Sequence, residues 1–219
     1  MLCYGGACKR IGGNWDVMKI GWVRGAALGM MAAMLVPAAA PAQQFSDSYT
    51  FLKAVRDRDG TKATDMINEP GTTVIDTRDR VTGDTALHIV TRGRDTTWLA
   101  FLLAKGAKPD TRDNNGNTPL MIAAQIGFAE GAQQLIARKA RVDLANSGGE
   151  TPLIRAVQNR DMGLVRMLLA AGANPRLSDT IAGMSARDYA QRDSRASAIL
   201  KMLDEQQVKK PANVAGPTL

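Results

Sequence analysis

The sequence predicts an all-α solenoid of about five stacked helix-turn-helix units. Three observations lead to this prediction. A short motif returns every 33 residues, as GDTALH, GNTPLM and GETPLI at Gly83, Gly116 and Gly149. Each motif contains residues that start a helix, and two apolar segments follow it within the same unit. A fixed period of this size indicates repeats that bury their apolar faces against one another.

The residues of each motif explain how its first helix begins. Thr118 can cap the helix with its hydroxyl, and Pro119 then occupies the first helical position, where a missing N–H costs nothing. A second apolar helix follows, most clearly over residues 98–103 and 164–169. Gly106 and Gly172 come after these segments, and a glycine in the left-handed conformation commonly ends a helix. Each unit is therefore expected to hold two helices.

The units can be placed along residues 46–206, followed by a flexible tail at 207–219. The first unit lacks the motif but has apolar segments at 51–55 and 63–67. Arg187 of the closing unit stands where the other units have a leucine, and a charged residue suits a unit with no neighbour beyond it. The later units are expected to begin near Arg80, Asp113, Asn146 and Asp179.

The middle unit departs from this pattern. Lys139 replaces the helix-ending glycine, and Gly131 and Gln134 replace larger apolar residues of the second helix. A glycine inside a helix costs about 1 kcal/mol relative to alanine. We therefore expect this unit either to form the weakest junction of the stack or to receive a side chain of a partner.

These residues resemble the ankyrin repeat, whose units are about 33 residues long and carry a T-P-L-H-x-A signature. Several copies in phase make the resemblance specific, and it covers most of residues 46–206. It implies stacked units with projecting loops and a concave surface that binds another protein. The chain looks like an exported bacterial member of the family.

Residues 1–42 are predicted to form a signal peptide region, and its start is expected at Met18. Lys19 and Arg24 precede an apolar run of 11 residues, and small residues then permit cleavage after Ala42. The run is too short for a comfortable membrane anchor, which needs roughly 20 apolar residues. We expect a cleaved, periplasmic protein. An uncleaved segment that anchors the chain to the membrane is the alternative.

Composition and charge exclude several classes of function. At 45% hydrophobic and 22% charged residues, the chain is neither a collagen nor a disordered protein. The net charge of +7 falls to +4 after cleavage, because four basic residues and one acidic residue lie upstream of the cut. This mild, dispersed excess does not favour a nucleic-acid partner.

The sequence offers no evident catalytic or metal site. Both cysteines, Cys3 and Cys8, precede the predicted cleavage site, and His88 is the single histidine. A zinc site needs more ligands than this. We expect His88 to bond the backbone of a neighbouring loop, and we expect no cofactor, no metal and no enzymatic activity.

The resemblance also implies which residues contact a partner, since ankyrin repeats bind through loop tips and inner helices. The inner-helix row carried onto this chain consists of Arg56, Arg92, Gln125, Gln158 and Arg192, with Ile126 and Asn159 beside it. The predicted loop residues are Arg78, Arg80, Arg112, Asn114 and Asn115. The row is partly basic with few carboxylates, which favours an acidic protein partner, although an ordinary solvated surface has the same composition.

The sequence therefore predicts a non-catalytic protein-binding module of the bacterial envelope that acts as a monomer. The alternative is a membrane-anchored factor that assembles or stabilises a periplasmic enzyme. The identity of the partner is not encoded in any motif.

Overall fold

The computed structural model describes residues 40–209, and side chains over residues 47–205. This part of the chain contains helices and no strand. The α-helices are α1 (Ala40–Asp57), α2 (Gly60–Asn68), α3 (Ala86–Arg92), α4 (Thr96–Ala104), α5 (Pro119–Ile126), α6 (Ala129–Ala137), α7 (Pro152–Gln158), α8 (Met162–Ala170), α9 (Ala186–Arg192) and α10 (Ser197–Lys209). Two short 3-10 helices, η1 (Val74–Asp76) and η2 (Ser194–Ala196), lie in the connections.

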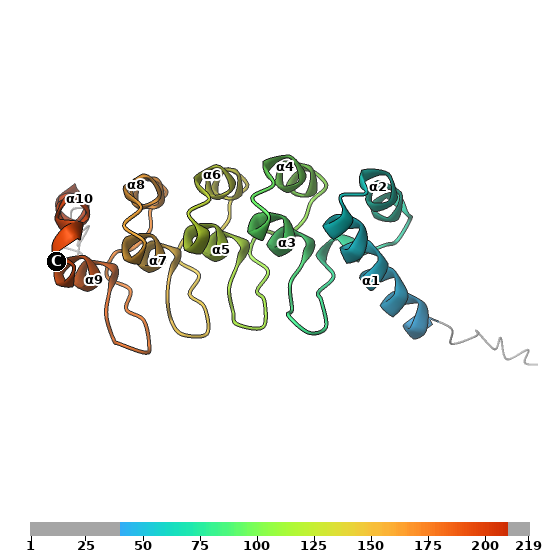
Figure 1. Cartoon of the computed structure of the whole chain (residues 1–219), viewed down its shortest axis with the longest axis horizontal. Helices are drawn as coiled ribbons and strands as arrows, with labels where there is room; N and C mark the ends of the chain where they lie inside the picture. The colour runs from blue at the N-terminus through green and yellow to red at the C-terminus, as the bar shows by residue number, and fades with distance from the viewer. Residues whose placement is uncertain (1–39, 210–219) are drawn as a thin grey trace, which may run out of the picture. The chain divides into compact units, whose positions relative to one another are not determined.

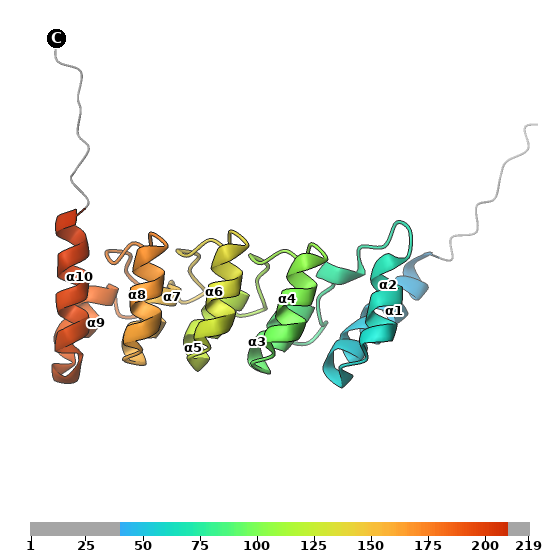
Figure 2. The ribbon, with the colours of Figure 1, turned by 90° about the horizontal axis from the view of Figure 1, so that it is seen from above.

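The helices form two rows. Figure 1 shows the inner helices α1, α3, α5, α7 and α9 side by side, with the outer helices α2, α4, α6, α8 and α10 above them. Figure 2 shows the outer row from above, each helix beside the next. Hairpin-like loops project from the inner row on the side away from the outer helices. The predicted all-α solenoid of about five units is confirmed.

The start signals predicted from the sequence operate as expected. The hydroxyl of Thr118 accepts a hydrogen bond from the backbone nitrogen of Met121 at 3.2 Å, and Pro119 begins α5. Thr151 and Pro152 do the same at the start of α7. The hydroxyl satisfies a backbone donor that no helical carbonyl can reach, and it thereby fixes the first turn.

One core runs through the stack, and the three middle inner helices α3, α5 and α7 each bury a leucine at the same position. Leu87, Leu120 and Leu153 are at most 1% exposed. At the equivalent position of α9, the side chain of Arg187 is 38% exposed and its Nε lies 2.7 Å from Asp204 Oδ1 on α10. The ion pair gives the outer side of the last unit a polar finish, as the sequence predicted for a closing unit.

The helix ends also match the prediction, with one informative exception. Gly106 and Gly172 have φ angles of +93° and +91°, and Lys139 occupies the same place in the middle unit with φ +66°. A side chain in this conformation is disfavoured relative to glycine. The packing of the unit therefore holds the backbone of Lys139 in this left-handed conformation.

The prediction that the middle unit receives a partner's side chain at Gly131 is wrong. The ring of Phe128 lies over this glycine, and a Cβ added to Gly131 would be 2.2 Å from Phe128 Cε1. Phe128 is buried. The volume that Trp98 and Leu164 fill in the neighbouring units is filled here by the protein's own phenylalanine. Whether this unit forms the weakest junction stays a prediction.

The signal peptide prediction falls on residues outside those described, except at its end. Helix α1 begins at Ala40, so the predicted cleavage after Ala42 would shorten it. Helices α1 and α10 extend slightly past the expected repeat boundaries at residues 46 and 206. Among the described helices, none has the length and apolar character that crossing a membrane requires.

Candidate protein-binding surface

The four projecting loops are each organised by their first side chain. At this position stand Asp79, Asp113, Asn146 and Asp179. Asp113 Oδ1 accepts hydrogen bonds from the backbone nitrogens of Asn115 and Asn117, both at 2.8 Å. Oxygens of the other three residues accept equivalent backbone bonds within their own loops. The carboxylate or amide thus holds the turn closed without help from a strand ladder.

Successive loops are also bonded to one another. The backbone nitrogen of each later loop donates to a carbonyl of the loop before it. These bonds run from Asn114 to Thr82 at 3.0 Å, from Ser147 to Asn115 at 3.0 Å and from Thr180 to Gly148 at 2.9 Å. The tips therefore form one continuous row rather than four independent loops.

The motif glycine is needed for this close approach. Gly116 has φ +77°, and a Cβ there would lie 2.7 Å from the backbone nitrogen of Ser147. Gly83 and Gly149 meet the next loop in the same way. The glycine thus serves both the left-handed turn and the packing of one loop on the next.

His88 ties the first motif to the next loop, as the sequence predicted. Its Nδ1 accepts from the backbone nitrogen of Thr85 at 3.1 Å, and its Nε2 lies 3.0 Å from the carbonyl oxygen of Asn117. These partners require the proton on Nε2. Burial lowers the pKa of His88 below its ordinary value, against the opposing effect of the Asn117 carbonyl. A neutral, structural histidine follows.

Two of the three arginines of the inner-helix row, Arg56 and Arg92, are paired within the chain, which corrects the expectation of few carboxylates near this row. Arg56 Nη2 lies 2.7 Å from Asp79 Oδ2 of the following loop. Arg92 Nη2 lies 3.2 Å both from Asp113 of the following loop and from Asp84 of its own. The bond from Arg56, together with backbone donors from the loop, lowers the pKa of Asp79 to about 2. Much of the predicted basic charge is thereby neutralised.

Two further predicted residues serve the stack. The Asn159 amide donates to the carbonyl oxygens of Ala124 and Gln125, at 3.0 and 2.9 Å, and so bonds α5 to the end of α7. Ile126 is half-buried against the core. Gln158 accepts from Arg155 at 3.3 Å, whereas the Gln125 side chain is exposed.

The predicted loop residues divide in the same way. Arg78 Nε donates to the carbonyl oxygen of Gly83 at 3.2 Å, and the Asn114 amide donates to that of Val81 at 2.8 Å. Arg80 is exposed and also engaged in an interaction. The side chains of Arg112 and Asn115 are exposed and make no hydrogen bond or ion pair with any other residue that the structure describes.

The sequence places Val81 at a loop tip but does not identify the matching apolar residue Ile181 in the last loop. Val81 and Ile181 are 85% and 81% exposed, and each lies two residues after the aspartate that opens its loop. Their loops have one residue more between aspartate and glycine than the two loops between them. That extra residue is the sequence signal that could have identified the first and last loops as different.

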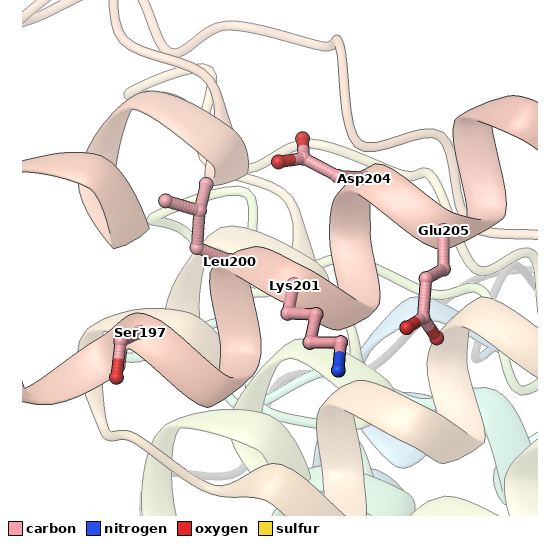
Figure 3. A pocket seen from close by; sticks show the side chains of 5 residues that line it. All are labelled: Ser197, Leu200, Lys201, Asp204 and Glu205. Carbon is pink, nitrogen blue, oxygen red and sulfur yellow. The ribbon is translucent and has the colours of Figure 1, made fainter.

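The described surface has two shallow hollows near the C-terminal end of the stack. One of about 450 Å³ lies between α7 and α9 on the inner row and is lined by Val157, Gln158, Met184, Tyr189, Arg192 and Asp193. Another of about 410 Å³ lies along α10 (Figure 3), where Lys201, Asp204 and Glu205 project from a single helix. Within the described residues, no group of three or more His, Cys, Asp and Glu side chains could hold a metal ion.

Comparison with known proteins agrees with this geometry. The family described as ankyrin repeats in three copies matches residues 52–144 and 87–179, which together exceed half of the chain. A protein of Treponema pallidum (strain Nichols), named as ankyrin repeat-containing, is 37% identical over 110 residues, which are 50% of this chain and 37% of that protein. The chain therefore spans well under half of this relative. The repeating loops, the two rows of helices and the family match show that the chain belongs to the ankyrin-repeat family.

Proposed function

We propose that the chain is a non-catalytic module that binds another protein on its inner-helix face and loop tips, in the bacterial envelope. Ankyrin repeats are interaction domains, and a repeat stack offers an extended concave surface for a partner. The observation that supports the proposal most is the row of bonded loops. It fixes the loop backbone that carries the exposed side chains, so that less backbone entropy remains to be lost on binding.

The residues best placed to contact the partner are those with no task inside the chain. Arg112, Asn115 and Gln125 are exposed, and their side chains have no hydrogen-bond or ion-pair partner among the described residues. Arg56, Arg92 and Asn159 stay in the proposed surface, but replacing any of them would also break bonds within the stack.

Capture experiments test the proposal. The full chain carrying an affinity tag would be expressed in its own host, crosslinked and purified, and its partners identified by mass spectrometry. The variant Arg112→Glu with Asn115→Asp should lose a specific partner at least about tenfold, because interfaces depend on a few central side chains. Arg166→Glu, at an exposed position of the outer helix α8, is the matched control. Equal capture by both variants would contradict the proposed surface.

The envelope location is tested separately. Cleavage after Ala42 leaves Gln43 as the first residue, and the intact mass of the chain recovered from the periplasm should correspond to residues 43–219. A full-length chain in the membrane fraction would instead favour the anchored assembly or stabilising factor. Recovery from the cytoplasm would contradict export.

A further inference from the structure

The arginine at the end of the last inner helix lacks the carboxylates that its counterpart has. Arg92 lies between Asp84, at the end of its own loop, and Asp113, at the start of the next. Arg192 holds the equivalent position of α9. In its own loop, Met184 takes the place of Asp84, and no described residue forms an ion pair with Arg192.

The contact that Arg192 does make is a weak one. Its Nη1 lies 3.0 Å from Met184 Sδ. A thioether sulfur is a poor acceptor, so the guanidinium gives up little when it turns to another group. The side chain is exposed, and it lines the 450 Å³ hollow between α7 and α9.

The rest of the hollow suits a carboxylate. Asp193 lines the hollow but pairs with Arg160, and the nearly buried Asp179 accepts from the hydroxyl of Tyr189 at 2.6 Å and from backbone nitrogens of its own loop. Among the described residues, neither of these carboxylates forms an ion pair with Arg192, so its guanidinium stays available to an acid of a partner. Val157 and Met184 also line the hollow and add apolar surface that a partner side chain can cover.

We propose that the hollow around Arg192 is a subsite for an aspartate or glutamate side chain of the partner protein, which takes the place that Asp84 and Asp113 have beside Arg92. The occupant is an acidic segment of a protein, and the proposal rests on the proposed function. It differs from a general preference for acidic partners because Arg56 and Arg92 are neutralised within the chain. Specificity then concentrates at the α7–α9 end of the inner row.

Selection from a random dodecapeptide library displayed on phage tests the subsite. Peptides selected on the full wild-type chain should be enriched in Asp and Glu, and Arg192→Gln should weaken their binding at least about tenfold, because charge-assisted bonds are the strong ones. Arg166→Gln removes the same charge from the outer row and should leave binding unchanged. A second variant, Met184→Asp, supplies the carboxylate in cis and should also block the acidic peptides while Arg192 remains.

The outcomes separate the two proposals. Peptides without acidic enrichment, or binding that survives both Arg192→Gln and Met184→Asp, would overturn the subsite. A specific partner captured by the full chain and lost in the Arg112→Glu, Asn115→Asp variant would still support the proposed function. If capture also yields no specific partner, both proposals fail.

Discussion

In the units on either side of the middle one, the outer helix begins with an aspartate cap and carries a large apolar residue three positions later. Asp95 caps α4 through the backbone nitrogen of Trp98, and Asp161 caps α8 through that of Leu164. In the middle unit Phe128 stands at the cap position, where it accepts no such bond, and Gly131 stands at the apolar position.

The comparison shows that the same core space can be filled by a side chain from a different position of the repeat. The Phe128 ring enters the space above Gly131, so the middle unit keeps a filled core. Because Phe128 replaces the aspartate, the middle unit lacks the helix cap and the ion pair that this aspartate makes in two of the other units. Arg58 and Arg160 each pair with an aspartate of the next unit, but Arg94 donates to the backbone carbonyl of Ile126. Packing and capping are thus separable features of the repeat.

The largest expected effect on stability comes from changing only one of the two residues, Phe128 or Gly131. Phe128→Ala should lower the free energy of unfolding by about 3–5 kcal/mol, because it leaves a cavity above Gly131. Gly131→Leu alone should also destabilise the chain, since the ring occupies the space that the new side chain needs. Together, Phe128→Asp and Gly131→Leu give α6 the arrangement that α8 has. The free energy of unfolding of this double variant should remain within about 1.5 kcal/mol of the wild type.

Urea unfolding followed by circular dichroism measures these differences. The mirror exchange in α8, Asp161→Phe with Leu164→Gly, is the control, and it should be better tolerated than Leu164→Gly alone. Additive losses in both double variants would show that the ring and the glycine are not coupled.

A smaller effect should separate the charged first junction from the neutral middle one. The pKa of Asp79 in the folded chain is about 2, below its ordinary value, mainly because of Arg56. Its contribution to stability is therefore present above about pH 4 and is lost as the pH falls toward about 2. Asn146, with Gln125 on the preceding helix, makes no such contribution.

Thermal unfolding across this pH range measures the difference. Asp79→Asn should lower stability at neutral pH and reduce the loss between about pH 4 and pH 2. Gln125→Arg with Asn146→Asp should add an acid-sensitive contribution to the middle junction. An unchanged acid profile in Asp79→Asn would show that the first junction does not depend on this pair.

A third comparison concerns the helix-ending position. Lys139→Gly should stabilise the chain by about 0.5–1 kcal/mol, because glycine adopts positive φ without steric cost. Gly172→Ala should destabilise it by a similar amount, and no atom lies within 4 Å of the added Cβ, so the backbone conformation alone is tested. Equal stability of Lys139→Gly and wild type, measured by urea unfolding, would mean that its strain is relieved locally.

The period, the caps and the leucine positions were accessible from the sequence because they follow from local rules. Thr118 and Pro119 favour the start of a helix through local bonds, and a glycine at position 106 or 172 favours the end of one. The place of Arg187 at the closing end followed from the same alignment of units. These features depend on neighbours in the chain and on the repeat period.

The missed features depend on contacts between units. Nothing local in Arg92 indicates that Asp84 and Asp113 lie beside it, since Asp113 belongs to the next unit. The sequence suggests an open space beside Gly131, because the residue that fills it, Phe128, stands where the neighbouring units have a capping aspartate. Comparing pairs of positions between units, such as 128 with 131 or 92 with 113, would have revealed both the filled space and the ion pair.

The last expected effect is confined to local opening of the middle outer helix. α6 has no side-chain cap, and the buried Oε1 of Gln134 has no hydrogen-bond partner among the described residues. The loss of a cap is worth about 1 kcal/mol, which corresponds to roughly a fivefold faster exchange of the amides that open with it. Amides at 130–136 should therefore exchange faster than those of α4 and α8.

Hydrogen exchange measured by mass spectrometry or NMR resolves this difference. The Phe128→Asp, Gly131→Leu variant restores the cap and should slow exchange in α6 toward that of its neighbours, while α4 and α8 serve as internal controls. If residues 130–136 are instead the best protected in the chain, the middle junction is not the weakest, and the buried Phe128 ring compensates for the missing cap as well as for the missing side chain.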